Sequence, residues 1–376
     1  MDKKYILVIN AGSSTLKFKV FTLPDLKTVK QGIVERIGLI NSFIILNGEK
    51  EINEVESHEE AFKLVIAKLG DIKNDIKLVG HRVVHGGEDF YKPTIITKKV
   101  MKKLRKYNKL APLHNPVNLS CIKASDRYIK DPPDIAVFDT SFYQTLPQHA
   151  YIYAIPLKYY QRHKIRRYGF HGISHQYVAQ EVAKKMKKPL RQLNLITCHL
   201  GSGCSITAIK KGQAIDTSMG FTPLEGLVMS TRCGNIDPAI PMYLMRKVKL
   251  NEEDVNNLLN KRSGLFGLSG SMDMRELLTK AGYSVPGFKM SGRIRKREKE
   301  IAQLTLEIFI YNIKKYIGAY SMILGKVDAL AFTGGIGERS KHIQRMVLKD
   351  LPKFKTFVIP ANEELMIARE AEKLIR

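Results

Sequence analysis

The chain has 376 residues, of which 44% are hydrophobic and 26% are charged, so it can bury a large core, and its length suggests two domains. It carries 62 Lys and Arg residues against 36 Asp and Glu residues, and the net charge of +26 makes nucleic acid, an anionic membrane or an anionic small molecule candidate partners. The basic residues are spread along the chain, and the densest run, 289–299, has little aromatic interleaving. This distribution favours a solvated basic surface over nucleic-acid binding.

The first expected element is a strand near the N-terminus. Its apolar run, residues 5–9, is too short for the core of a signal peptide, and no stretch of the chain reaches the length of a membrane span. We therefore expect no membrane association and a cytoplasmic location. The four cysteines have no CxxC spacing, and we expect reduced thiols rather than metal ligands or disulfides; they are Cys121, Cys198, Cys204 and Cys233.

Further strands and helices follow in two successive groups. Ser57 and Glu60 have the S-x-x-E spacing of a capping box ahead of a helical pattern. The expected strands cover residues 5–10, 16–21, 43–46, 78–84, 134–139, 194–200, 205–212, 214–219, 328–335 and 354–360. The expected helices cover residues 61–69, 97–108, 115–128, 176–187, 238–246, 252–259, 273–281, 300–324 and 362–375, with another beginning around Gly337.

A strand, a glycine turn and a second strand occur twice, as VINAGSSTLKF and as CHLGSGCSITAI. Each pair is followed by further strands and then helices. This weak repeat predicts an α/β protein of two duplicated lobes, with a turn from each lobe facing the other. The alternative is two unrelated hairpins, because Gly-Ser turns are common.

Three glycine-containing loops have the chemistry of phosphate binding. In the segment 10–17, NAGSSTLK, small residues let backbone amides approach an anion, hydroxyls can donate to phosphate oxygens, and Lys17 adds a charge. Neither this loop nor LGSGCS has Walker A spacing, so each alone is a weak signal. FTGGIGERS, 332–340, is stronger because a strand ends in glycines where a helix begins, which lets a nucleotide lie against the backbone.

Six polar residues lie beside glycine or proline turns or at strand ends, where loop-built active sites gather. Two of them are arginines, whose fork matches carboxylate and phosphoryl oxygens, and one is an aspartate that could hold Mg²⁺ or orient the attacking oxygen. No Ser-His-Asp or Cys-His spacing supports hydrolysis by a protein nucleophile. The six are Arg82, His114, Asp139, His171, His199 and Arg232.

With these residues in view, the sequence resembles the acetate kinase family, which includes propionate and butyrate kinases. The motifs that carry the resemblance follow one another over nearly the whole chain: VINAGSSTLKF, VGHRVVHGGE, LAPLHNP, VFDTSFYQTLP, RRYGFHGISH, HLGSGCS, DTSMGFTPLEGL, TRCGNIDP, SGLFGLSG, FTGGIGE and NEELMIARE. The resemblance implies the fold of actin-like ATPases and sugar kinases, two duplicated α/β lobes with the active site in the interlobe cleft. It also implies an N-terminal lobe of residues 1–140 plus 364–376, a nucleotide-binding C-terminal lobe of residues 141–363, and a homodimer.

The resemblance assigns roles to individual residues. The implied catalytic residues are Asn10, Arg82, Asp139, His171 and Arg232, with His114 and His199 in support. The implied metal ligands are Asn10 and Glu363, with Glu364 as the fallback. The implied acyl-binding residues are Arg82, Val84, Leu113, Phe170 and Pro223. The implied nucleotide-binding residues are Ser13, Thr15, Lys17, His199, Ser202, Gly203, Asp273, Met274, Arg275, Gly335, Ile336 and Arg339.

The chain departs from the family pattern at several positions, none of which is an implied catalytic residue. Ser202 and Arg339 each stand where Asn is usual, and Tyr143 stands where His is common. Around Arg232 the usual Gly, Ser and Asp are replaced by Ser230, Cys233 and Asn235, so hydrogen bonding behind that arginine should differ. The stretch 282–297 is more basic than expected.

The implied activity is that of a phosphotransferase with a carboxyl acceptor. The γ-phosphoryl group of ATP passes directly and reversibly to acetate, giving acetyl phosphate and ADP, with Mg²⁺ or Mn²⁺ as cofactor. Propionate kinase is the alternative within the family, because one methylene in an apolar pocket changes binding by only about 1–3 kcal/mol. From a different class, the chain could be a non-catalytic, actin-like nucleotide-binding protein; the presence of both arginines, Asp139 and His171 together argues against it.

Overall fold

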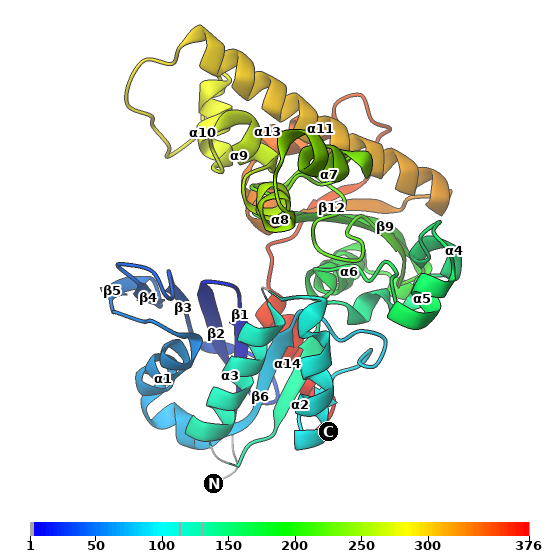
Figure 1. Cartoon of the computed structure of the whole chain (residues 1–376). Coiled ribbons are helices and arrows are strands. Elements are labelled where there is room, and N and C mark those ends of the chain that lie inside the picture. The colour runs from blue at the N-terminus through cyan, green and yellow to red at the C-terminus, as the bar shows by residue number, and fades with distance from the viewer. Residues whose placement is uncertain (1–3, 113, 130, 376) are drawn as a thin grey trace. The chain divides into compact units, whose positions relative to one another are not determined.

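The computed structural model describes residues 4–112, 114–129 and 131–375 (Figure 1). Its contacts divide the chain into two compact units. The first unit contains the described residues up to Gln144, the segment Gly172–Tyr177 and the described residues from Asn362 onward. The second unit contains Thr145–His171 and Val178–Ala361. In the described part of the chain, no helix has both the length and the apolar character needed to cross a membrane.

The first unit is built on an eight-stranded sheet in the order β5-β4-β3-β2-β1-β6-β8-β7. The hairpin of β1 and β2 is antiparallel, whereas β1, β6 and β8 run parallel to one another. In β2 the apolar side chains of Leu16, Phe18 and Val20 are buried, as the period of two along a strand predicts. The strands are β1 (Tyr5–Ala11), β2 (Thr15–Thr22), β3 (Thr28–Glu35), β4 (Phe43–Leu46), β5 (Glu49–Ile52), β6 (Ile76–Val83), β7 (Thr94–Ile95) and β8 (Asp134–Phe138).

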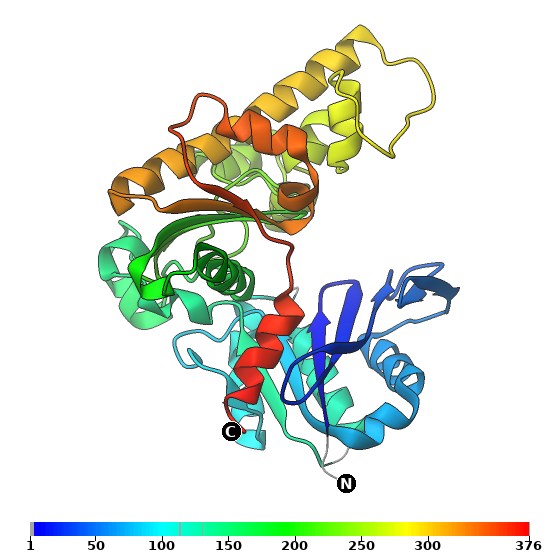
Figure 2. The ribbon, with the colours of Figure 1, turned by 180° about the vertical axis from the view of Figure 1, so that it is seen from behind.

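Helices cover both faces of this sheet (Figures 1 and 2). The helix α1 (His58–Leu69) begins at the predicted capping box, where the Ser57 side chain accepts a hydrogen bond from the Glu60 amide. Together with α3 (Asn115–Tyr128) it packs on one face, and α14 (Glu363–Glu372) packs against β1, β6 and β8. A Cβ atom at Gly80 would lie 3.0 Å from Ile367, so the missing side chain allows α14 to approach β6 closely. The short helix α2 (Lys98–Leu104) and a 3-10 turn replace the single helix predicted over 97–108.

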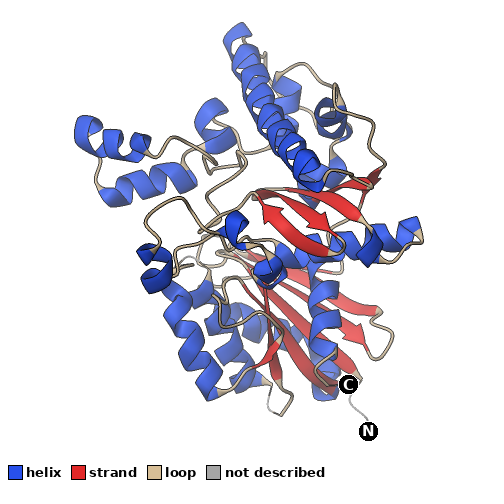
Figure 3. Cartoon of the chain, turned by 90° about the vertical axis from the view of Figure 1, so that its right-hand side faces the viewer, coloured by secondary structure: helices blue, strands red, loops and turns tan. Residues whose placement is uncertain are grey.

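The second unit contains a five-stranded sheet in the order β11-β10-β9-β12-β13 (Figure 3). Its three sequential strands are antiparallel, and β9, β12 and β13 are parallel. The same pattern occurs in the first unit as β3-β2-β1-β6-β8, so the predicted duplication of an α/β lobe is confirmed. The strands are β9 (Asn194–Leu200), β10 (Cys204–Lys210), β11 (Gln213–Thr217), β12 (Ala329–Thr333) and β13 (Thr356–Val358).

The longest helix of the described chain, α11 (Lys296–Leu324), packs on β9 and β10 through side chains such as Phe309, Ile313 and Ile317. It begins four residues before the predicted start because the Glu298 carboxylate accepts a hydrogen bond from the Arg295 amide, so the basic residues that follow lie on its exposed first turns. The other helices are α4 (Gln148–Tyr151), α5 (Lys158–His163), α6 (Gly172–Met186), α7 (Ala239–Tyr243), α8 (Glu252–Lys261), α9 (Gly264–Ser269), α10 (Met274–Lys280), α12 (Gly334–Arg339) and α13 (Lys341–Leu348).

Candidate active site

The carboxyl ends of three neighbouring parallel strands bring Asn10, Arg82 and Asp139 together in the first unit. Asn10 lies near the end of β1, Arg82 near the end of β6, and Asp139 directly after β8. Arg82 donates from Nε to Asp139 Oδ2 at 2.9 Å and from Nη1 to Asn10 Oδ1 at 3.2 Å. Its Nη2 makes a second, shorter bond to the same Asp139 oxygen. Parallel strands end at the same edge of a sheet, which is why three residues far apart in sequence meet here.

Burial and charge act in opposite directions on this pair. Asp139 is 1% exposed, and burial raises the pKa of its carboxyl group, while the charge of Arg82 opposes that rise. Burial also disfavours the Arg82 guanidinium, but the carboxylates of Asp139 and Glu363 more than compensate and raise its pKa above the ordinary value. Asp139 Oδ1 has no hydrogen-bond partner among the described residues, so one oxygen of this buried carboxylate is available to a ligand.

The first turn of α14 adds two carboxylates to the cluster. The Asn10 side-chain nitrogen donates to Glu363 Oε2 at 3.1 Å and to Glu364 Oε1 at 2.9 Å. Lys19 lies 3.4 Å from Glu364 Oε2 and donates to the Asn362 side chain at 2.8 Å. Asn362 caps α14 by accepting from the Leu365 amide. Lys19 therefore both compensates the charge of Glu364 and fixes the start of the helix.

The oxygen atoms of this cluster suit a hard cation such as Mg²⁺. Asp139 Oδ1 is one oxygen that could bind the cation, because it has no hydrogen-bond partner among the described residues. The charge of Glu363 acts on the pKa of Asp139, so a second carboxylate lies near the first. The Asn10 amide oxygen accepts one hydrogen bond from Arg82, and the Asn10 nitrogen orients the glutamates; its role as a metal ligand stays a prediction. Within the described residues there is no group of three or more His, Cys, Asp or Glu arranged to hold a metal. The fit is thus to a cation bound by two carboxylates and otherwise by non-protein oxygens.

A second cluster forms in the second unit around His171. This residue has a left-handed backbone conformation, with φ of 58°, directly before α6. Its Nδ1 lies 2.9 Å from Ser205 Oγ, and its ring stacks on that of His199 with centroids 4.3 Å apart. Ser205 and His199 are partners in the pairing of β10 with β9, so the sheet fixes both neighbours of the His171 ring.

Gly203 allows His171 and Arg232 to lie over the same stretch of bare backbone. A Cβ atom at Gly203 would lie 3.1 Å from His171 Cε1, 3.2 Å from His171 Nε2 and 3.6 Å from Arg232 Nη1. Arg232 donates from Nη1 to the Pro223 carbonyl at 3.1 Å, and burial lowers the pKa of its guanidinium. Among the described residues, no carboxylate acts on the pKa of Arg232. A largely buried cation without a counter-ion is a binding site for an anion.

A cavity of about 920 Å³ lies beside the LGSG turn and α12 in the second unit. Its size falls in the range of small-molecule and cofactor sites. Gly334, with φ of 78°, packs its backbone against the Leu200 carbonyl, and Gly335 beside it leaves open space toward the cavity. Seven of the residues assigned to the nucleotide line this cavity: Ser202, Asp273, Met274, Arg275, Gly335, Ile336 and Arg339.

Other predicted site residues lie elsewhere. Ser13, Thr15 and Lys17 lie in the β1–β2 hairpin of the first unit, and His199 and Gly203 lie against His171 rather than along the cavity. In the acyl set, Val84 is buried in the first unit and its amide donates to Asn118, whereas Phe170 and Pro223 belong to the second unit. His114 precedes α3 without capping it through its side chain. Leu113 lies outside the described residues.

Sequence reasoning missed one wall of the cavity. This wall comes from the loop after α10 and from the start of α13, where His342 Nε2 lies 2.8 Å from the Ser284 carbonyl and its ring packs beside Tyr283. The only signal in the sequence was the unusual basic character of 282–297. The lining residues absent from the predicted nucleotide-binding set are Gly201, Ser230, Met272, Leu278, Ser284, Val285, Pro286, Ser340, Lys341, His342 and Arg345.

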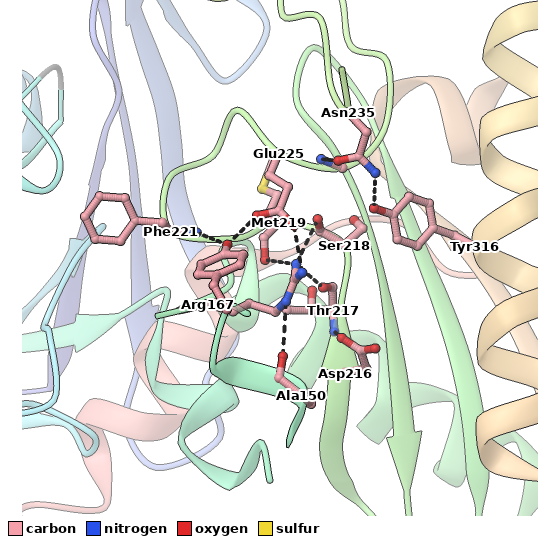
Figure 4. A network of polar contacts seen from close by, with 12 residues as sticks. Ala150, Arg167, Asp216, Thr217, Ser218, Met219, Phe221, Glu225, Asn235 and Tyr316 are labelled. Carbon is pink, nitrogen blue, oxygen red and sulfur yellow. Dashed lines mark hydrogen bonds and ion pairs between the residues drawn. The ribbon is translucent and has the colours of Figure 1, made fainter. Parts of the chain in front are cut away.

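The departures from the family pattern have defined surroundings. The Ser230 amide donates to the Ser202 carbonyl at 3.1 Å, so two departures join the Arg232 loop to the LGSG turn. Asn235 accepts from the Gly226 amide at 2.8 Å and donates to the Tyr316 hydroxyl at 2.7 Å (Figure 4). Arg339 is largely exposed on the rim of the cavity, where its Nε lies 3.4 Å from Glu338.

Comparison with known proteins agrees with this geometry. The model of the acetokinase family matches residues 5–354. The chain is 45% identical to the acetate kinase of Acetivibrio thermocellus, with 99% of each chain covered, and 44% identical to that of Halothermothrix orenii, with 98% of this chain and 99% of the relative covered. Among solved structures, Porphyromonas gingivalis acetate kinase is 37% identical with a TM-score of 0.88, covering 99% of this chain and 100% of that one. A propionate kinase from Francisella tularensis is 36% identical with a TM-score of 0.90, covering 98% and 99%. The chain therefore belongs to the acetokinase family.

Proposed function

We propose that this protein is an acetate kinase, which transfers the γ-phosphoryl group of ATP reversibly to acetate and forms acetyl phosphate and ADP. The observation that carries the proposal is the buried Arg232 without a carboxylate partner, beside His171 over the bare backbone of Gly203. Phosphoryl transfer spreads negative charge over the equatorial oxygens of a loose transition state, and fixed cations in a dry site stabilise that charge.

The other candidate site residues have separate roles in this reaction. The nucleotide binds in the cavity beside Gly335, and its phosphates extend toward the LGSG turn. There, backbone amides and Arg232 donate hydrogen bonds to the phosphate oxygens. In the second unit, Arg232 binds the carboxylate of the acid, while His171, held by Ser205, donates a hydrogen bond to the transferring group. In the first unit, Arg82 is a further candidate for binding carboxylate or phosphoryl oxygens. Asp139 keeps Arg82 charged and oriented, because its Oδ2 accepts hydrogen bonds from both Nε and Nη2.

We further propose that Asp139 and Glu363 hold Mg²⁺ or Mn²⁺, with Asn10 orienting Glu363. The cation, when bound, would neutralise charge on the phosphates. Lys19 compensates Glu364, which makes Glu363 the more effective ligand of the two neighbours. Glu363→Gln should therefore raise the Mg²⁺ concentration needed for half-maximal activity far more than Glu364→Gln does. An equal shift in both variants would contradict this division of roles.

Acetate is the first acceptor to test, and propionate is the second. The candidate acyl contacts are Val84 in the first unit and Phe170 and Pro223 in the second, and residue types alone do not separate two acids that differ by one methylene. The similarity to a propionate kinase from Francisella tularensis keeps this second candidate open.

We propose a cytoplasmic homodimer, as the family resemblance implies. Apolar side chains exposed on α7 and on the turn that follows it support a protein partner, because soluble monomers rarely expose contiguous apolar patches. These side chains are Ile240, Met242, Tyr243, Met245 and Val248.

Hydroxylamine trapping of acyl phosphate tests the proposal directly. Purified protein would be incubated with ATP, Mg²⁺ and, separately, acetate, propionate or butyrate, with Arg232→Ala as the matched inactive control. We expect acyl hydroxamate from wild type with acetate preferred. Absence of product from every acid, together with salt-dependent DNA binding at physiological ionic strength, would instead favour a nucleic-acid-binding role for the +26 charge.

A further inference from the structure

Arg167 joins two segments of the second unit that carry candidate acyl-binding residues (Figure 4). Its Nη1 donates to the carbonyls of Thr217 at 3.0 Å, Met219 at 3.3 Å and Ser218 at 3.4 Å. Its Nε donates to the Ala150 carbonyl at 3.3 Å. One side chain therefore satisfies four carbonyls, one within the short helix α4 and three at the end of β11 and in the loop that follows it.

Glu225 closes this arrangement from the other side of the loop that follows β11. Arg167 Nη2 donates to Glu225 Oε1 at 2.7 Å, and the Tyr153 hydroxyl makes a short hydrogen bond to Glu225 Oε2. The same hydroxyl accepts from the Phe221 amide at 2.8 Å. A Cβ atom at Gly220 would lie 1.6 Å from Glu225 Oε2, so the carboxylate fills the space that a larger residue would need. We call Arg167, Glu225 and Tyr153 the clamp.

Electrostatics favour the charged form of the clamp. Burial disfavours the Arg167 charge, but the neighbouring acidic groups together, Glu225 foremost, outweigh burial and raise the pKa of the guanidinium above its ordinary value. The side chains are only 17% and 31% exposed, so water screens the ion pair less than it would at the surface. Burial, then the charge of Glu225, raises the pKa of Tyr153, which keeps its hydroxyl proton for donation.

Along the chain, Arg167 precedes Phe170 and Glu225 follows Pro223, so the clamp brackets both candidate acyl-binding residues. The segment of Arg167 leads to Phe170, and within it the amides of Tyr168 and Gly169 donate to the Gly220 carbonyl at 3.0 and 3.3 Å. The loop from Gly220 to Glu225 contains Pro223, whose carbonyl accepts from Arg232. Loosening the clamp would therefore shift two walls of the acyl pocket relative to each other.

We propose that the clamp determines which acyl chain the enzyme accepts, by fixing the spacing between Phe170 and Pro223. The proposal rests on the function proposed above. Arg167, Glu225 and Tyr153 act as positioning residues, since they hold backbone rather than substrate. A tight pocket discriminates against one added methylene by about 10–200-fold, and a pocket with a mobile wall loses part of that discrimination. The small acid then loses packing, while the longer acid gains room.

The test compares kcat/KM for acetate and propionate in wild type, Glu225→Gln and Tyr153→Phe. Gln keeps the size of Glu225 but removes the charge that Arg167 pairs with, and Phe removes only the hydroxyl. We expect the acetate-to-propionate ratio of kcat/KM to fall by about fivefold or more in Glu225→Gln, which is part of the discrimination that one methylene supplies. The fall should be smaller in Tyr153→Phe, and the KM for ATP should stay within about twofold in both, because neither residue lines the nucleotide cavity.

Asp328→Asn is the matched control. Asp328 accepts from the Asn194 amide at 2.8 Å at the opposite ends of the strands of the same unit, so its loss weakens the unit without touching the clamp. We expect a lower melting temperature and an unchanged acetate-to-propionate ratio. Ratios within twofold of wild type in both clamp variants would overturn the proposal. Loss of folding in both would also overturn it, since the clamp would then serve only the fold.

Hydrogen exchange supplies a readout that does not depend on activity. The amides of Phe221 and Gly226 should exchange faster in the clamp variants and at the wild-type rate in Asp328→Asn, because the clamp orders the loop between them. Faster exchange in the clamp variants, together with a wild type that makes no acyl phosphate, would contradict the proposed function while leaving the mechanical role of the clamp. Unchanged exchange would contradict the clamp itself.

Discussion

Replacing Arg232 with alanine should remove most turnover while leaving ATP binding intact. Arg232 uses Nη1 to bind the Pro223 carbonyl, which leaves Nε and Nη2 to bind the reacting oxygens. Each hydrogen bond from a charged group contributes about 1.5–3 kcal/mol, so two of them supply roughly 3–6 kcal/mol of transition-state stabilisation. One factor of ten in rate corresponds to about 1.36 kcal/mol, and the expected loss in kcat is therefore on the order of 10² to 10⁴.

The same substitution should not destabilise the fold. Burial lowers the pKa of Arg232, which means that folding works against its charge, and no carboxylate in the described chain compensates for it. We expect the melting temperature of Arg232→Ala to equal or exceed that of wild type. The assays are hydroxamate formation for kcat, equilibrium binding for the Kd of ATP, and thermal unfolding. Turnover within threefold of wild type would refute the role of Arg232, and a large loss of stability would refute the reasoning about its burial.

Three further predictions concern the fold and the site. Asp139→Ala should destabilise the protein by about 3–5 kcal/mol in denaturant unfolding, because it leaves the largely buried Arg82 charge without the carboxylate that accepts two of its hydrogen bonds. The double variant Arg82→Met/Asp139→Leu should lose less stability, and equal losses would contradict this coupling. Gly203→Ala should reduce kcat by about tenfold or more with little change in melting temperature, because its Cβ would lie 3.1 Å from His171. Gly318→Ala, in α11 and with nothing within 4 Å of the added Cβ, should keep wild-type kcat. Similar kcat values in the two variants would argue against this steric reason. Burial lowers the pKa of His85 to about 3, whereas the unfolded chain binds a proton there at the ordinary pKa of about 6.5. The contribution of neutral His85 to folding stability is therefore present above pH 6.5 and is lost as the pH falls, by roughly 2 kcal/mol at pH 5. If the free energy of unfolding of His85→Asn depends on pH as strongly as that of wild type, the assignment is contradicted.

The sequence predicted the repeated lobe and most of its strands because both follow from local patterns. The paired runs VINAGSSTLKF and CHLGSGCSITAI correspond to the β1–β2 and β9–β10 hairpins, and Ser57 caps α1 as its spacing with Glu60 indicated. The start of α6 was wrong by four residues, since the left-handed conformation of His171 begins the helix at Gly172 and is not encoded in apolar spacing.

The site was less accessible to sequence reasoning because its contacts are long-range. Arg82 and Asp139 were selected by their places at strand ends, but the hydrogen bonds from Asn10 to Glu363 and Glu364 depend on how α14 packs against β1. The clamp was missed for the same reason. Arg167 and Glu225 are ordinary charged residues in sequence, and only the fold brings them within hydrogen-bonding distance.

The position of α14 in the chain has a consequence for synthesis. The first unit takes its sheet from residues before Gln144 but receives this helix from a segment that follows the whole second unit. A ribosome adds roughly 5–20 residues per second, and domains tend to fold as their chain emerges. The face of the sheet over β1, β6 and β8 therefore stays uncovered while more than half of the protein is synthesised. Because Glu363 and Glu364 arrive with the helix that covers this face, completion of the first unit and acquisition of its cation-binding carboxylates become a single late event.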